Sequence, residues 1–340
     1  MFKLNVLVAG STGYIGIQLV NLLTKHKFVN IKYLCGNSSV GKNIAVYDKK
    51  LKNKKLPKII KFNYKFLKDV DIIFTALPNG EAQKISKKLL SKNILIDLAA
   101  DFRLRKSSDY LKWYKQKHQA PKLIKNSFYS LPELTGEKLK NYQIIGCPGC
   151  YPTSILLALT PLLKKKLISE KNIIIDSKSG YSGAGRGVHK KYENKNLYES
   201  LSAYGVGFHR HNSEIEQFLK NFTNNKIIFT FTPHLTPMFR GILSTIYVDL
   251  NKGKTINNIY NELVRFYKNS SFVKVVNIDS MLSTNNVINT NNCEISVCKS
   301  KYKNKAIILS SIDNLIKGGA GQAIQNMNIL KNLKEQEGLK

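Results

Sequence analysis

The chain has 340 residues, more than a single hydrophobic core usually supports, so we predict two domains. Its net charge is +32, but only six of the 54 basic residues are arginine and the lysines are spread over every segment, which disfavours nucleic-acid binding. No apolar run approaches the roughly 20 residues of a membrane span and no signal-peptide pattern is present, so we expect no membrane association and a cytoplasmic protein.

The first half of the chain alternates apolar runs with helical patterns. Apolar runs predict buried strands at residues 4–10, 31–36, 70–78, 93–101 and 142–149. Apolar residues at helical spacing predict one helix after the first strand and another between the third and fourth strands. Such alternation is typical of a doubly wound parallel sheet, so we predict an α/β fold with an N-terminal Rossmann-type domain over residues 1–149.

A glycine-rich loop follows the first predicted strand. Its residues are Gly10, Ser11, Thr12, Gly13, Tyr14, Ile15 and Gly16. The glycines permit a tight turn and a close approach to a pyrophosphate at the helix N-terminus; the alternative is an ordinary βα turn, which the strand–loop–helix context disfavours. Residues 35–42, after the second strand, hold no carboxylate for a ribose hydroxyl, whereas Ser38 and Lys42 suit a 2′-phosphate. We therefore expect NADP(H) as the cofactor.

A cysteine pair lies in the turn after the last of these strands, in the sequence GCPGCYPT. Because Pro152 suits an early helical position, we expect Cys150 just before a helix, where the dipole and free N–H groups favour a thiolate. The alternatives are a redox C-x-x-C, half of a zinc site and a plain buried thiol. We favour a nucleophile, and we expect no metal because Cys293 and Cys298 stand in strand-like sequence as buried thiols.

The second half of the chain predicts a different kind of domain. Longer, more alternating runs predict strands at residues 172–180, 226–235, 241–250, 273–278, 293–300 and 305–314. Helices are predicted from about Ser154 to Lys166 and over residues 256–269. Strands of this kind are typical of a mixed or antiparallel sheet, so we predict an α+β domain over residues 150–311.

Two histidines flank an arginine just before a further predicted helix. If this segment is extended, the rings of His209 and His211 point to the same face. One of the pair is a candidate acid–base group; the alternative is a structural histidine that caps the helix or faces solvent.

Arginine-bearing loops indicate where an anionic substrate would bind. The candidates are Arg103, Arg186 and Arg210, of which Arg186 ends a glycine- and serine-rich loop suited to phosphate or carboxylate. His189 and His234 lie near such loops and are expected to contact substrate. His26 and His118 stand in polar, lysine-rich sequence and are expected at the surface.

A set of motifs gives the chain a specific resemblance. Between residues 7 and 328 it carries, in order, GSTGYIG, ALPNG, DLAADFRL, CPGCYPT, SGYSGAGR, HRHNSEIEQ, TPHLTPMFRGI and KGGAGQAIQNMN. With these motifs in this order, the chain resembles the N-acetyl-gamma-glutamyl-phosphate reductase family. The resemblance implies NADPH-dependent reduction of N-acetyl-L-glutamyl 5-phosphate to the 5-semialdehyde through a cysteine thioester, a step of arginine biosynthesis.

The resemblance also implies an architecture and a set of site residues. The fold is that of aspartate-semialdehyde and glyceraldehyde-phosphate dehydrogenases, in which residues 312–340 return to the N-terminal domain and the second domain forms a homodimer or homotetramer. Cys150 matches the nucleophile, and His211, ahead of His209, matches the acid–base group. Further cofactor contacts are expected from Pro78, Ser182, Gly183, Asn314 and Gln322.

Four positions, Asn79, Ala99, Ser130 and Cys147, depart from the family pattern. None of them removes the nucleophile, although Cys147 suggests a disulfide with Cys150 under oxidation. The nearest alternative is the same chemistry on an aspartyl or aminoadipyl phosphate, since a pocket discriminates one methylene only modestly. From another class, a basic nucleic-acid-binding protein with a relic nucleotide domain is disfavoured by the intact cysteine and histidine motifs.

Overall fold

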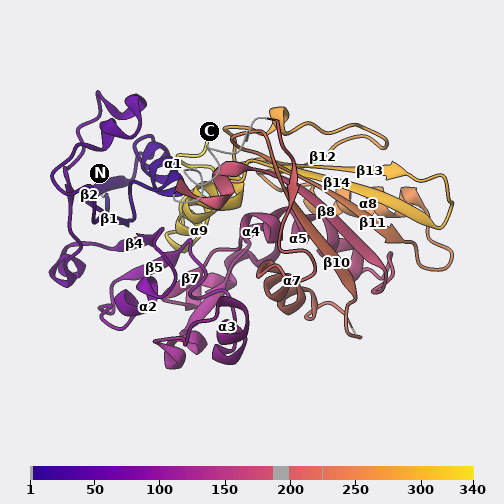
Figure 1. Ribbon diagram of the computed structural model, residues 1–340, viewed down its shortest axis with the longest axis horizontal. Coiled ribbons are helices and arrows are strands. Elements are labelled where there is room, and N and C mark those ends of the chain that lie inside the picture. The colour runs from indigo at the N-terminus through magenta and orange to yellow at the C-terminus, as the bar shows by residue number, and fades with distance from the viewer. Residues whose placement is uncertain (1–2, 187–198, 224) are drawn as a thin grey trace. The chain divides into compact units, whose positions relative to one another are not determined.

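The chain divides into two compact units. The computed structural model describes residues 3–186, 199–223 and 225–340. The first unit is Met1–Gly149 together with Gly319–Lys340, and the second is Cys150–Gly318 (Figure 1). The return to the first unit comes at Gly319 rather than at residue 312, because the turn after the strand Lys305–Ile312 still belongs to the second unit.

The first unit is built on a seven-stranded parallel sheet. Its strands are β1 (Leu4–Ala9), β2 (Val29–Cys35), β3 (Ile59–Ile60), β4 (Ile72–Thr75), β5 (Ile94–Asp97), β6 (Ser127–Tyr129) and β7 (Ile144–Gly146). Their order is β3-β2-β1-β4-β5-β7-β6, and every neighbouring pair is parallel. The chain leaves β1 toward β2 on one side and returns to β4 on the other, so β1 ends at the switch point where such sheets bind ligands. The predicted Rossmann-type sheet is confirmed.

Helices that follow the strands cover this sheet. They are α1 (Tyr14–Leu23), α2 (Glu81–Ser86), α3 (Ser107–Tyr114), α4 (Pro132–Thr135) and α9 (Gly321–Leu330). In α1 the apolar residues Ile17, Leu19 and Val20 are buried, as the helical spacing predicted.

The last helix, α9, completes the core of the first unit. Its residues 321–328 are all buried, and Oδ1 of Asn328 lies 2.9 Å from Nε2 of His26, 302 residues away in the chain. The expectation that His26 lies at the surface is therefore wrong, because α9 covers it. His118 is buried as well, and its Nε2 lies 2.8 Å from the carbonyl oxygen of Asp101. Polar flanking sequence did not reveal that both rings fill buried hydrogen-bonding positions.

The second unit is built on a mixed seven-stranded sheet. Its strands are β8 (Ile173–Gly180), β9 (Ser202–Ala203), β10 (Phe229–Thr236), β11 (Ile242–Asp249), β12 (Val273–Val275), β13 (Cys293–Lys299) and β14 (Lys305–Ile312). The order is β12-β13-β14-β11-β8-β10-β9, with β8–β10 and β12–β13 parallel and the other pairs antiparallel. Cys293 and Cys298 lie buried in β13, as expected.

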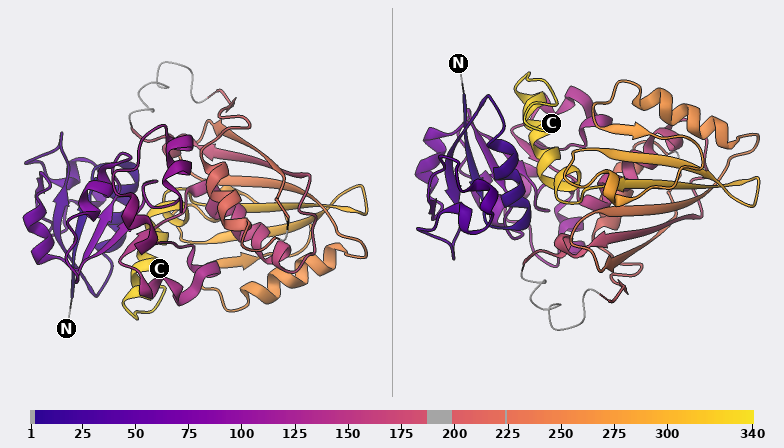
Figure 2. Two further views of the ribbon diagram at one scale, coloured as in Figure 1. Left: turned by 90° about the horizontal axis from the view of Figure 1, so that it is seen from below. Right: turned by 90° about the horizontal axis from the view of Figure 1, so that it is seen from above.

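Helices α5 (Cys150–Lys164), α7 (His211–Leu219) and α8 (Ile256–Tyr267) pack along one face of this sheet (Figure 2). Helix α5 starts at Cys150, four residues before the expected Ser154. It can do so because the N–H that Pro152 lacks has no intrahelical partner in a first turn. Residues 151–163 of α5 are all buried, so the second unit is assembled around the helix that begins with Cys150.

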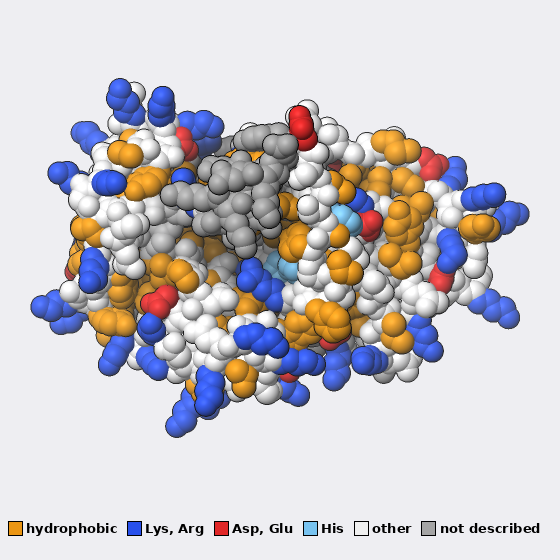
Figure 3. All heavy atoms as spheres, viewed as in Figure 1, with side chains coloured by type: hydrophobic (Ala, Val, Ile, Leu, Met, Phe, Trp, Pro, Cys, Tyr) orange, Lys and Arg blue, Asp and Glu red, His pale blue; other side chains and the backbone are white. Residues whose placement is uncertain are grey.

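The basic side chains are dispersed. Figure 3 shows lysine and arginine scattered over the visible face, with no single basic stripe. Within the described ranges, no helix is long and apolar enough to cross a membrane.

Candidate active site

The predicted nucleophile stands at the start of a helix. Cys150 is the first residue of α5; it is half-buried and its thiol forms no disulfide. The first turn of α5 holds no acidic residue. A helix start presents N–H groups without intrahelical acceptors and the positive end of the dipole, so it favours a thiolate and can receive an oxyanion formed on substrate.

A buried hydroxyl network fixes α5 on the sheet of the second unit. Oγ of Ser154 lies 2.7 Å from Oγ of Ser244, which lies 2.7 Å from Oγ of Ser177. Ser310 donates a hydrogen bond of 2.9 Å to the carbonyl oxygen of Ser154. All four serines are fully buried, so the first turns of α5 are tied to three strands.

The other thiol of the C-x-x-C pair has a different environment. Burial raises the pKa of Cys147 to about 12, and Nδ2 of Asn326 approaches its Sγ at 3.6 Å. No disulfide joins Cys147 to Cys150, since all five cysteines are free. Very little of Cys147 is thiolate near neutral pH, which leaves Cys150 as the reactive member of the pair.

Aromatic rings gather beside Cys150. The ring of Tyr151 meets those of His209 and His211 edge-on, with centroids 5.8 Å and 5.9 Å away, and the two imidazoles are 4.7 Å apart. The segment is not extended, the condition under which the sequence placed both rings on one face: Arg210 has helical dihedral angles and α7 begins at His211. The rings meet because the chain turns there, with the backbone N–H of His211 donating to Nδ1 of His209 at 3.2 Å.

The two histidines have different surroundings. Burial, with the charge of Arg210, lowers the pKa of His209 to about 4, so this ring is neutral near pH 7. Nε2 of His211 lies 3.7 Å from Oε1 of Glu214, one helical turn later, and that carboxyl group is fully buried. Glu214 was not predicted from the sequence, although a carboxylate three residues after a candidate histidine was a visible signal.

Acid should destabilise the protein through His209. Its pKa of about 4 in the folded chain lies below the ordinary 6.5, so between these values the unfolded chain binds a proton that the folded chain excludes. The contribution of His209 is complete above pH 6.5 and is lost as the pH falls toward 4. Between pH 8 and pH 5 the free energy of unfolding of the wild type should therefore fall by about 2 kcal/mol more than that of His209→Gln. Urea unfolding of both proteins at both pH values checks this, and an equal change in the two would contradict it.

The predicted anion-binding arginines are not alike. Arg186 and Arg210 are exposed in the second unit. Arg103 is buried in the first unit, where its guanidinium donates to the carbonyl oxygens of Cys147 at 2.8 Å and Leu98 at 3.0 Å. These contacts hold the turn that precedes Cys150, so the structure indicates a structural role for Arg103. A substrate role for it stays a prediction.

Of the two histidines expected to contact substrate, the structure describes His234. Nδ1 of His234 lies 2.9 Å from Oδ1 of Asp176 on the neighbouring strand β8, so this ring is engaged in an ion-pair geometry within the sheet. His189 lies outside the described residues.

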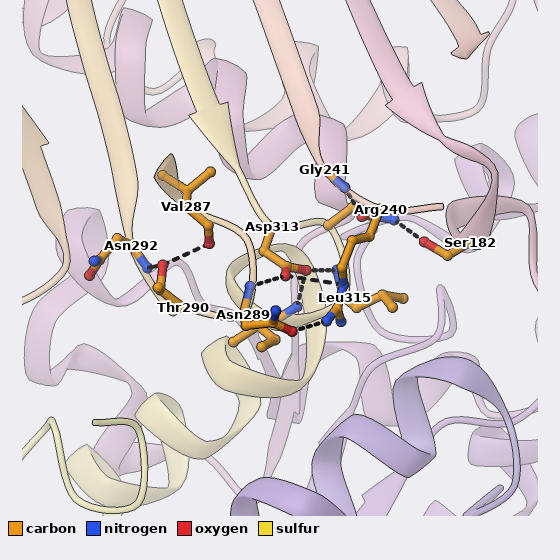
Figure 4. Close-up of polar contacts among 11 residues, drawn as sticks. Ser182, Arg240, Gly241, Val287, Asn289, Thr290, Asn292, Asp313 and Leu315 are labelled. Carbon is orange, nitrogen blue, oxygen red and sulfur yellow. Dashed lines mark hydrogen bonds and ion pairs between the residues drawn. The ribbon is translucent and has the colours of Figure 1, made fainter. Parts of the chain in front are cut away.

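Three predicted cofactor residues meet in the second unit. Asn314, after β14, donates from Nδ2 to Oγ of Ser182 at 3.0 Å, and its Oδ1 accepts from the N–H of Gly241 at 2.7 Å. Gly183 is exposed beside them, where a Cβ would lie 3.4 Å from Nδ2 of Asn314. These contacts, with the neighbouring Arg240, are drawn in Figure 4.

The glycine-rich loop of the first unit fits a pyrophosphate. Gly10 has φ +84°, and a Cβ there would lie 2.2 Å from the carbonyl oxygen of Ala76; a Cβ on Gly16 would lie 2.1 Å from that of Gly10. Helix α1 begins at Tyr14 after Gly13, and no side chain caps its N-terminus. Among the described residues, no side chain therefore competes as a cap for the backbone amides at this helix start, which follows the switch point.

The other predicted cofactor residues of the first unit differ in their exposure to solvent. Ser38 and Lys42 are exposed in the connection from β2 to β3, and the carbonyl oxygen of Lys42 accepts from Ile59 at 3.0 Å. Pro78 is exposed after β4, whereas Gln322 is buried in α9. The sequence did not single out two carboxyl groups at the end of β5 and just after it, Asp97 and Asp101. Burial, with the charge of Asp101, raises the pKa of Asp97 to about 7.

Among the residues that the structure describes, no group of three or more His, Cys, Asp or Glu could hold a metal ion.

Two family descriptions match the chain, one over each unit. Residues 5–142 match the NAD binding domain of semialdehyde dehydrogenase, and residues 150–314 match the semialdehyde dehydrogenase dimerisation domain. The N-acetyl-gamma-glutamyl-phosphate reductase of Brachyspira hyodysenteriae is 46% identical over 99% of this chain and 98% of that protein. The probable chloroplastic N-acetyl-gamma-glutamyl-phosphate reductase of Arabidopsis thaliana is 41% identical over 97% of this chain and 82% of that protein.

Solved structures share the fold at much lower identity. Aspartate semialdehyde dehydrogenase II of Vibrio cholerae has a TM-score of 0.70 with 16% identity, over 98% of this chain and 99% of that chain. Aspartate semialdehyde dehydrogenase of Candida albicans, solved with NADP, has a TM-score of 0.66 with 16% identity, over 97% of this chain and 98% of that chain.

Proposed function

The chain belongs to the N-acetyl-gamma-glutamyl-phosphate reductases of the semialdehyde dehydrogenase family, and from this membership we propose how its residues carry out the reaction. The reaction reduces N-acetyl-L-glutamyl 5-phosphate to N-acetyl-L-glutamate 5-semialdehyde and phosphate, a step of arginine biosynthesis. The observation that carries the assignment of roles is the placement of Cys150 at the start of α5, with Tyr151 joining it to the His209–His211 ring pair.

The first step forms a thioester. The thiolate of Cys150 attacks the acyl carbonyl, a C–S bond forms, and the bond from carbon to the phosphate oxygen breaks to release inorganic phosphate. N–H groups at the start of α5 stabilise the oxyanion of the tetrahedral intermediate. Exposed Arg186 and Arg210 are our candidates for holding the anionic groups of the substrate, since a guanidinium binds phosphate or carboxylate in a bidentate way.

The second step is a reduction followed by loss of the thiolate. The Gly10–Gly16 loop would hold the nicotinamide cofactor, which would supply the hydride that reduces the thioester carbonyl. We assign His211 as the group that protonates the resulting oxyanion and then accepts the proton back as the C–S bond breaks and aldehyde leaves. The carboxyl group of Glu214 lies 3.7 Å from Nε2 of His211, whereas His209, with a pKa of about 4 and Nδ1 accepting a backbone N–H, is suited to orienting its neighbour.

A nicotinamide cofactor follows from the family, and we propose that it is NADPH. The connection after β2 exposes Ser38 and Lys42 and contains no acidic residue from Gly36 to Lys42. The nearest carboxylate after it, Asp48, accepts from Nδ2 of Asn21 at 2.6 Å and is thus engaged elsewhere. A hydroxyl and an ammonium suit a 2′-phosphate.

Ser38→Asp is expected to reverse the cofactor preference. A carboxylate here would repel the 2′-phosphate and accept from the ribose hydroxyls of NADH. Loss of one charge-assisted contact should lower kcat/KM for NADPH by about 10- to 100-fold. Steady-state kinetics with both cofactors measure this, with Ser91→Asp, exposed before β5, as the matched control. A lower KM of the wild type for NADH than for NADPH would overturn the assignment.

The assay that tests the function runs the reaction backward. Wild-type protein with N-acetylglutamate semialdehyde, phosphate and NADP⁺ should produce NADPH only when all three are present. Aspartate semialdehyde and the one-methylene-longer aminoadipate semialdehyde serve as competing substrates. A higher kcat/KM for either of them, or turnover without phosphate, would contradict the proposed substrate or the acyl-phosphate chemistry.

We also propose a homodimer or homotetramer that pairs through the second unit. The matched dimerisation domain covers residues 150–314, and the facing pair Ile174 and Tyr247 leaves apolar side chains 51% and 41% exposed on its sheet. Five free cysteines fit the reducing cytoplasm, which we keep as the proposed compartment.

A further inference from the structure

We propose that Asp313 is a positioning residue for Cys150, acting through Gly318 in the turn that Asp313 closes. The inference rests on the nucleophilic role proposed for Cys150. It concerns only residues of the second unit, and it gives a role to a carboxylate to which the reaction chemistry assigns none.

Gly318 is the residue in contact with the nucleophile. A Cβ added to Gly318 would lie 2.7 Å from Cβ of Cys150, 3.1 Å from its Cα and 3.3 Å from Cδ1 of Ile312. The two nearest atoms, Cβ and Cα of Cys150, are held by the backbone of α5, so they cannot swing aside as the end of a long side chain can. The backbone of Gly318 therefore forms the wall against which the Cys150 side chain rests.

Asp313 fixes the position of the Gly318 backbone. Its Oδ1 accepts from the N–H groups of Leu315 at 2.8 Å and Ile316 at 3.1 Å, and its carbonyl oxygen accepts from the N–H of Gly318 at 2.9 Å. The last bond belongs to a π-helical turn, Ile316–Ala320, a conformation often found at functional sites. Asp313 thus fixes both the start of the turn, at Leu315 and Ile316, and the position of the Gly318 backbone.

A buried ion pair holds Asp313 itself. Its Oδ2 accepts from the N–H of Asn289 at 2.8 Å and lies 3.2 Å from Nε of Arg240, whose Nη1 donates to the side chain of Asn289 (Figure 4). The Asp313 side chain is fully buried and that of Arg240 is 11% exposed. Five contacts hold the carboxyl group and the backbone carbonyl oxygen of Asp313. They fix the position of Asp313 and, through its bonds to the turn, the position of the turn.

The test measures the nucleophile directly. In full-length protein, the rate constant for alkylation of Cys150 by iodoacetamide is followed by mass spectrometry from pH 5 to pH 10, beside kcat and KM. Gly318→Ala and Asp313→Asn should each slow alkylation and lower kcat by about 10- to 100-fold, because misplacement by about 1 Å has effects of that size. The alkylation profile should move to higher pH as the thiolate leaves the helix start, while KM for NADP⁺ stays unchanged.

Matched variants separate positioning from general damage. Asp279→Asn removes a carboxyl group that also accepts a backbone N–H, from Lys299 at 2.8 Å, and pairs with Lys299 Nζ at 3.0 Å. Gly253→Ala adds a methyl where no atom lies within 4 Å, at a φ of +75°, so it costs stability by backbone strain without touching Cys150. Both should alkylate as the wild type does. If Asp313→Asn does not fold, Gly318→Ala decides, because it leaves the Arg240 pair intact.

A double variant tests whether Asp313 and Gly318 act through the same contact. Because both changes act through one contact, the double variant should be no slower than the slower single variant. Wild-type alkylation rates and pH profiles in folded Gly318→Ala would overturn the proposal. Alkylation needs no substrate, so this result is independent of whether the wild type reduces N-acetylglutamyl phosphate.

Discussion

Cys150→Ser should lower kcat for phosphate-dependent NADP⁺ reduction by about 10⁴-fold or more. A serine hydroxyl at the start of α5 is not ionised near neutral pH, so neither the thioester nor its hydride acceptor forms. The dissociation constant of NADPH should stay within about two-fold, since the Gly10–Gly16 loop belongs to the other unit and keeps its backbone geometry. Stopped assays for turnover and cofactor fluorescence for binding give the two readouts.

Cys147→Ser provides the matched control. As in Cys150→Ser, oxygen replaces sulfur, here three residues earlier in the chain. Cys147, however, is buried and its pKa is raised to about 12. Turnover should persist, and only stability should fall. Equal loss of kcat in both variants would remove the distinction between a reactive and a buried thiol; retention of more than a tenth of the activity by Cys150→Ser would remove the covalent mechanism.

His211→Asn should lower kcat by about 10²- to 10⁴-fold, the usual size of a general acid–base contribution. Asparagine keeps a polar group at the start of α7 but cannot shuttle a proton at the thiohemiacetal. KM should change little, because the loss falls on the chemical steps. His209→Asn should cost less, since its ring is already neutral and holds a backbone N–H. The reverse ranking of the two variants would exchange the proposed roles.

Glu214 offers a finer test of the same assignment. Its carboxyl group lies 3.7 Å from Nε2 of His211 in a fully buried position. Glu214→Gln removes the carboxylate beside Nε2 of His211, so we expect a lower kcat with little change in KM. Glu216→Gln, exposed on the same helix, is the control. An unchanged kcat in Glu214→Gln would show that this carboxyl group does not act on the histidine.

Local patterns were enough to predict most of the fold. The long strands of both sheets, such as β8 and β11, follow from runs of alternating or continuous apolar residues, and the order of strands and helices indicated the parallel sheet. Two-residue strands such as Ser202–Ala203 were missed, because they exist only through pairing with a distant neighbour. The start of α5 was placed at about Ser154 from the apolar pattern, although Pro152 already suited an early helical position, and the helix in fact begins at Cys150.

The residues of the candidate site also differ in how far the sequence could predict them. Cys150 and the glycine-rich loop have local signals, since their chemistry depends on the helix that directly follows each. The role of Asp313 depends on burial and on its contact with Arg240, 73 positions away, which no short window of sequence contains. Glu214 stands only three residues after His211, but its full burial could not be predicted from the sequence. His26 shows the limit most clearly: polar neighbours in sequence suggested the surface, and a helix from the other end of the chain covers it.

The return of α9 to the first unit bears on how the protein is made. Translation delivers the nucleotide-binding sheet first, but Asn326 and Asn328, which bond to Ser130 and His26, emerge last. Domains ordinarily fold in the order of synthesis. Here the second unit has all of its residues before the first unit is complete, so it can fold while the first unit still lacks α9. A chain cut before Gly319 should therefore unfold the first unit more easily than the second, because His26 and Ser130 lose their partners.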